Sequence, residues 1–144
     1  MRRPRIAMAA VGAVLAALTL TSCAGASGDD SFMQKIPAAL DSSDLGITES
    51  WADKGVDGFN THVSVGATFD RAEITAADLQ QLIAIVVEEN TIDPRWLQLA
   101  IEDPAGDDID IAPLLTELGA EPTVDAFVRI GYDEARTIAA ESTR

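Results

Sequence analysis

Cysteine and histidine are nearly absent from this sequence: each occurs once among 144 residues. A single cysteine cannot form an internal disulfide, and one cysteine with one histidine cannot supply the usual ligands of a zinc site. The sequence also lacks a glycine-rich phosphate loop and the His-Glu-x-x-His motif of zinc proteases. We therefore expect no cofactor and no metal, and we assign no catalytic residue.

Basic residues are scarce beyond the first few positions. Ten basic residues stand against 24 acidic ones, and three of the ten are Arg2, Arg3 and Arg5. From residue 23 onward the chain has 24 acids and 7 bases, a net charge of −17. Proteins bind nucleic acid through lysine and arginine side chains that neutralise phosphates. We therefore expect no nucleic-acid partner.

An uncharged segment follows the early arginines, over residues 6–20. A helix that spans a membrane needs about 20 apolar residues, whereas the apolar core of a signal peptide needs about 7–15. The basic start, the length of the apolar segment and the small residues behind it predict a signal peptide. A short buried helix is the alternative.

The four residues after this segment are Leu20, Thr21, Ser22 and Cys23, the only cysteine of the chain. They resemble the lipobox of bacterial lipoproteins. The resemblance implies that a diacylglyceryl group, with acyl chains such as palmitate, is attached to Cys23 and that residues 1–22 are cleaved off. It also implies a lipid-anchored protein on the extracytoplasmic side of the cell membrane. A secretory signal with a free cysteine nearby is the alternative.

Residues 23–31 are small and polar and include two glycines. Such a composition cannot build a core, so it predicts a flexible tether behind the lipid. Eight residues of this kind reach about 15 Å. Residues 32–144 then form a single acidic domain, which is long enough to bury a core without disulfides.

Two periodic segments are the clearest elements of this domain. From Phe59 to Phe69, apolar and polar residues alternate, which predicts a strand with one packed and one polar face. Thr75 is a suitable N-cap for a helix that follows, with Asp78 at the third helical position. Its apolar stripe repeats at helical spacing and comprises Leu79, Leu82, Ile83, Val86 and Val87.

The remaining segments follow the same two periods. Strands are predicted at 46–54 and 96–102, and residues 124–132 alternate like a further strand. Helices are predicted at 32–40, where Pro37 should kink or end the helix, at 111–118, and at 133–141. Three to four mainly antiparallel strands with helices on one face make an α+β two-layer sandwich. The early element order resembles that of the BON domain of bacterial envelope proteins, some of which contact phospholipid.

The polar face of the predicted sheet is the candidate binding site. If the strands pair as expected, this face displays Asn60, His62, Ser64, Thr68, Trp96 and Gln98. Trp51 is a further candidate for the same face. Tryptophan among small polar groups is typical of recognition surfaces. The alternatives are that the terminal segments cover the face or that Trp96 packs at its edge.

Two other groups of residues invite a chemical interpretation. His62 can be interpreted as a general base, but mid-strand placement favours a solvated histidine. The densest acidic cluster comprises Glu102, Asp103, Asp107, Asp108 and Asp110. Its spacing does not match an EF-hand loop, and a solvated turn beside a helix N-terminus accounts for it.

These features predict a non-enzymatic binding or accessory module, anchored to the membrane through Cys23 and partnered by another envelope protein. Two alternatives remain at this point. One is a small envelope hydrolase that uses His62 or a pair of carboxylates. The other is a carrier of lipid or solute.

Overall fold

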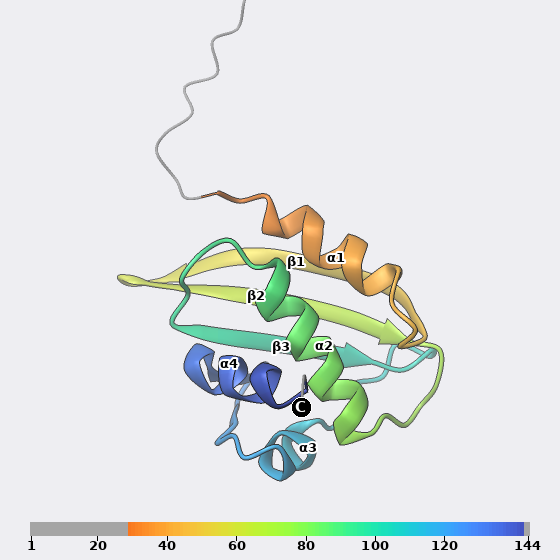
Figure 1. The fold of residues 1–144 in the computed structure, drawn as a ribbon. Helices are drawn as coiled ribbons and strands as arrows, with labels where there is room; N and C mark the ends of the chain where they lie inside the picture. Colours follow the sequence, from red (N-terminus) through yellow and green to blue (C-terminus); the bar gives the residue numbers. More distant parts are fainter. Residues whose placement is uncertain (1–28, 143–144) are drawn as a thin grey trace, which may run out of the picture.

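The computed structural model describes residues 29–142. The elements of this range are helix α1 (Phe32–Asp41), strands β1 (Ile47–Asp57) and β2 (Asn60–Phe69), helix α2 (Ala76–Glu89), strand β3 (Trp96–Glu102), helix α3 (Ala112–Glu117), strands β4 (Thr123–Val124) and β5 (Val128–Gly131), and helix α4 (Tyr132–Glu141) (Figure 1). The predicted signal peptide, the lipobox with Cys23 and residues 23–28 of the tether lie outside the described range.

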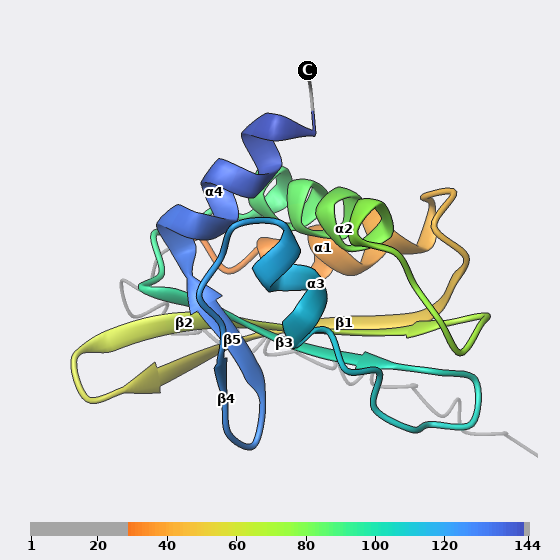
Figure 2. The same ribbon diagram turned by 90° about the horizontal axis from the view of Figure 1, so that it is seen from below.

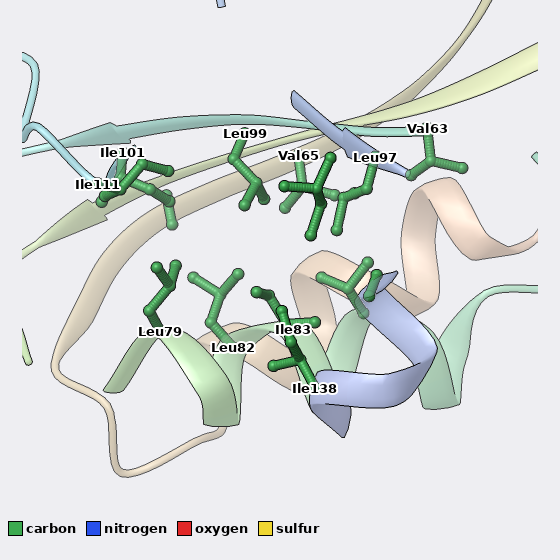
Figure 3. Packing of buried hydrophobic residues seen from close by; sticks show 14 of the residues in the cluster. Val63, Val65, Leu79, Leu82, Ile83, Leu97, Leu99, Ile101, Ile111 and Ile138 are labelled. Carbon is green, nitrogen blue, oxygen red and sulfur yellow. The ribbon is translucent and has the colours of Figure 1, made fainter. Parts of the chain in front are cut away.

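The described residues form two layers, with the helices on one face of a single sheet (Figure 2). This arrangement confirms the predicted α+β class. Hydrophobic side chains of α2 and α4 point toward those of β2 and β3 (Figure 3). All large side chains that are fully buried are apolar, and no polar or charged residue of the described range is buried. The opposite face of the sheet carries no covering layer from residues 29–142.

The sheet differs from the expectation in strand number and direction. It has five strands in the order β1-β2-β3-β5-β4, rather than three to four. The pair β2–β3 is parallel, and the other pairs are antiparallel. The parallel pair arises because α2 crosses from the end of β2 back to the start of β3, as parallel neighbours require. The sheet is therefore mixed.

The extra strand arises because residues 124–132 do not form one strand. A tight turn at Asp125–Phe127 divides the segment into β4 and β5. The Asp125 side chain accepts a hydrogen bond from the Phe127 backbone N–H over 3.2 Å, and the Asp125 N–H donates to the Phe127 carbonyl over 3.1 Å. Neither glycine nor proline marks this turn, so the alternation of apolar and polar residues over 124–132 gave the impression of one continuous strand.

Helix α2 begins as predicted. Thr75 is its N-cap, and the Thr75 hydroxyl accepts a hydrogen bond from the Asp78 N–H over 3.2 Å. The Asp78 carboxylate in turn accepts from the Thr75 N–H over 2.8 Å. Leu79, Leu82, Ile83 and Val86 of the apolar stripe are buried, so the stripe faces the sheet as the spacing indicates.

Helix α1 continues through Pro37. Pro37 lies inside the helix without ending it, because Ile36 and Leu40 on either side are buried against the sheet and hold the helix together. Ser31 is the N-cap but its side chain forms no capping hydrogen bond. Ahead of the helix, Asp30 forms an ion pair with Lys54 of β1.

Candidate functional site

The uncovered face of the sheet carries the predicted binding residues. The parallel register of β2 and β3 places His62 beside Trp96 and Ser64 beside Gln98. Antiparallel pairing with β1 adds Asp53 beside Ser64 and Trp51 beside Gly66. The structure thus brings the four central candidates together, and Trp51 lies on the same face. Asn60 and Thr68 lie at opposite ends of β2, about 26 Å apart at the usual rise of a strand.

Phe59 is placed differently from the expectation. The alternation began the strand at Phe59 and assigned its ring to the packed side. In the structure β2 begins at Asn60, and Phe59 lies in the hairpin turn with its side chain fully exposed. The Asp57-Gly58 turn before it, with Gly58 at a φ of 60°, releases Phe59 from the core.

A stack of planar groups crosses β2, β3 and β5 near the Asn60 end of this face. The rings of His62 and Trp96 have centroids 5.8 Å apart and an interplanar angle of 11°. On the other side of Trp96, the Arg129 guanidinium lies 5.7 Å from the indole centroid. Cations at this distance from an indole are attracted to its face. Next to the stack, the Ser64 hydroxyl donates to the Gln98 side-chain oxygen over 3.0 Å.

Two glycines of the strands determine how the aromatic rings lie. A Cβ atom at Gly55 would come within 2.0 Å of the His62 Nε2 atom, and one at Gly66 would come within 2.1 Å of the Trp51 Nε1 atom. Both rings therefore lie directly over the backbone of a glycine, where no side chain stands in the way. Glycine inside a strand often marks such a close approach. Sequence reasoning missed Gly55, Gly66 and Arg129, although the two glycines carried this signal.

The surroundings of His62 bear on a catalytic role. Its Nδ1 atom is buried and has no hydrogen-bond partner in the described part of the chain, and the same is true of Trp96 Nε1. A histidine that acts as a general base is normally oriented by a hydrogen bond to its second nitrogen. Within residues 29–142 no carboxylate plays this part for His62. The geometry suits stacking on a planar group.

A hollow of about 940 Å3 opens at the end of the face where Asn60 and Trp96 lie. Its charged lining contains three arginines and five acids, namely Arg95, Arg129, Arg136, Asp57, Asp93, Glu121, Asp133 and Glu134. Arg136 forms ion pairs with Asp93 over 2.7 Å and with Asp133 over 3.1 Å. Arg136 is thus paired with acids of the hollow itself, whereas Arg129 pairs with Asp125, which lies outside the lining.

The acidic cluster between β3 and α3 forms a turn. The Asp103 carboxylate accepts hydrogen bonds from the backbone N–H groups of Ala105 over 2.8 Å and Asp107 over 3.0 Å. Asp110 accepts from the Ala112 N–H at the start of α3 over 3.2 Å. Across residues 29–142, no three histidine, cysteine or acidic side chains are grouped so that they could hold a metal ion.

Comparison of the chain with protein-family models, curated proteins and solved structures gives no match. The resemblance to the BON domain therefore remains one of element order. None of the helices between residues 29 and 142 is long and apolar enough to cross a membrane.

Proposed function

We propose that this chain is an exported lipoprotein, anchored to the membrane by a lipid on Cys23, whose domain binds another envelope protein without catalysing a reaction. The observation that carries the binding role is the uncovered sheet face, on which His62, Trp96 and Arg129 stack beside Ser64 and Gln98. Aromatic and arginine side chains contribute much of the binding energy at protein interfaces. A surface of this kind suits a protein partner.

The charge of the domain argues against a lipid surface as the partner of this face. A net charge of −17 over residues 23–144 is repelled by anionic headgroups, which attract basic segments instead. In this proposal the membrane is contacted through the lipid on Cys23 and the tether. The domain stays close to the membrane and faces other envelope proteins.

Photo-crosslinking in cells tests which face binds. A photoreactive residue replaces Thr68 on the uncovered face, and in a matched variant it replaces Gln81, which is exposed on α2. We expect a discrete crosslinked protein from position 68 and none from position 81. Equal yields from both positions would show that the uncovered face has no special role.

Two substitutions of His62 separate binding from catalysis. His62→Phe keeps a ring on Trp96 but removes the titratable nitrogens, whereas His62→Ala removes the stack. A binding face should retain its crosslinks in the Phe variant and lose most of them in the Ala variant. The function of the protein in cells is scored by whether each variant complements a deletion of its gene. If neither variant complements, although the Phe variant retains its crosslinks, the result would favour the hydrolase over the binding module.

The anchor is tested by membrane fractionation of Cys23→Ser beside the parent, with intact mass measured for both. We expect the parent in the membrane fraction with a mass equal to residues 23–144 plus two or three acyl chains. The variant should be released. A variant that stays on the membrane would contradict the lipid anchor and indicate an uncleaved helix.

A further inference from the structure

A second hollow, of about 520 Å3, lies between the end of β3 and the β4–β5 hairpin. It is lined by residues 99–102 of β3, residues 108–111 and the hairpin residues 124–128, with Trp51 at its side. We call it the hairpin groove. In Figure 2 the hairpin projects from the sheet on the side away from the helices, so the groove adjoins the uncovered face.

Exposed apolar side chains concentrate in the hairpin groove. Among the described residues, five large hydrophobic side chains are exposed, and three of them line this groove. Trp51 and Phe127 are each 46% exposed, and Val124 is 62% exposed. Apolar groups that gather at a hollow in this way commonly mark a binding site. The other two, Val56 and Phe59, lie near the β1–β2 turn.

The charged lining of the hairpin groove is of one sign. It contains Glu102, Asp108, Asp110 and Asp125 and no basic residue, whereas the first hollow contains three arginines. Asp125 is paired with Arg129, and Asp110 accepts from the Ala112 N–H. In the described structure the side chains of Glu102 and Asp108 form no ion pair or hydrogen bond, so they are free to meet a cation.

We propose that the hairpin groove binds a basic segment of the partner protein, in which lysine or arginine side chains flank one apolar anchor residue. This inference rests on the proposed function and specifies the partner's chemistry. The anchor would contact Trp51 and Phe127, and the flanking cations would meet Glu102 and Asp108. The negative charge of these carboxylates repels anionic lipid, and it also disfavours binding of a second copy of this acidic chain.

The test uses the mature lipidated protein in neutral detergent micelles and three amidated, acetylated peptides: Lys-Lys-Phe-Lys-Lys, Glu-Glu-Phe-Glu-Glu and Lys-Lys-Ser-Lys-Lys. Binding is followed by NMR through the indole N–H signals of Trp51 and Trp96, the two tryptophans of the chain. We expect the basic phenylalanine peptide to shift the Trp51 signal most. Salt should weaken its binding, because exposed charges are screened.

Matched variants test the two parts of the groove. Phe127→Ser should weaken the basic phenylalanine peptide about tenfold, and Phe59→Ser, an exposed phenylalanine at the other hairpin, should leave it unchanged. Glu102→Gln with Asp108→Asn should weaken it about fivefold. Glu88→Gln with Glu89→Gln removes the same charge from α2 and is the control. Unchanged thermal melting establishes that each variant is folded.

Three outcomes overturn the proposal: equal binding of the acidic peptide, equal binding of the serine peptide, or no selective effect of the groove variants. These outcomes leave the proposed function intact if crosslinks from position 68 persist. Conversely, the peptides and variants can behave as expected while position 68 gives no crosslinks. The groove would then bind basic segments as proposed, and the proposed role of the sheet face in binding an envelope protein would be contradicted.

Discussion

Gly66→Ala should destabilise the domain because the ring of Trp51 occupies the space that the new methyl group needs. A Cβ atom at Gly66 would lie 2.1 Å from Trp51 Nε1 and 2.2 Å from Trp51 Cε2. Carbon atoms cannot approach that closely, so the indole must leave the strand surface. An ordinary Gly→Ala change inside a strand is favourable by about 0.5–1 kcal/mol. The opposite sign at this position is therefore diagnostic.

The size of the effect follows from the burial of Trp51. With 46% of its surface exposed, the side chain buries about 130 Å2 of the roughly 250 Å2 available to a tryptophan. At about 25 cal/mol per Å2 this contact stabilises by at most about 3 kcal/mol. If the displaced ring keeps half of its contact, about 1.5 kcal/mol is lost. After the favourable backbone effect, the net loss of unfolding free energy is about 0.5–1 kcal/mol.

Urea unfolding followed by far-ultraviolet circular dichroism measures this without relying on tryptophan fluorescence. The four proteins of the cycle are the parent, Gly66→Ala, Trp51→Ala and the double variant. Once Trp51 is removed, Gly66→Ala should stabilise by about 0.5–1 kcal/mol, which gives a coupling of about 1.5 kcal/mol between the two sites. If the two changes add within about 0.5 kcal/mol, the ring does not rest on Gly66 and the reasoning fails.

Four further predictions concern the supporting structure. Thr75→Ala should lower the unfolding free energy by about 1 kcal/mol in urea titrations. Burial opposes ionisation of Asp78, but hydrogen bonds from Thr75 and the Arg71 ion pair hold its pKa below 3.8. The stabilisation that the ionised Asp78 side chain contributes to the fold should disappear as the pH falls below 3.8. In Thr75→Ala this loss of stability with falling pH should be less steep. Burial raises the pKa of Tyr132 above 10.0, so stability should decline as the pH rises past 10.0, a decline that Tyr132→Phe should reduce in thermal melts. Ile83→Ala should lower the unfolding free energy by about 2–5 kcal/mol. A change near zero would contradict the place of Ile83 in the core.

Local patterns predicted the central elements well. The alternation ending at Phe69 and the stripe from Leu79 to Val86 reflect periods that each element imposes on its own residues. Those periods determine which side chains face the core. The arrangement of strands depends instead on which strands become neighbours, and no local pattern records that. The parallel β2–β3 pair was missed for this reason. The turn at Asp125 was missed because no glycine or proline stands at residues 124–128 to mark it.

The candidate face was predictable as a set of residues but not as a geometry. Alternation separated His62 and Ser64 from the core side of β2, and it did the same for Trp96 and Gln98 on β3. Their pairing depends on a register that the crossover through α2 sets, and short-range spacing does not contain this information. Arg129 was missed because its strand was interpreted together with the residues of the preceding turn.

The way the chain joins the domain has a mechanical consequence. Tension applied ahead of residue 29 reaches the fold through α1, which is held by the buried side chains of Phe32, Ile36 and Leu40 and, just before it, by the Asp30–Lys54 ion pair. A helix packed by side chains can detach one contact at a time, whereas sheared strands must break many hydrogen bonds together. Under load α1 should therefore detach first, as a local unfolding event. The sheet with its stacked rings would remain folded after α1 has detached.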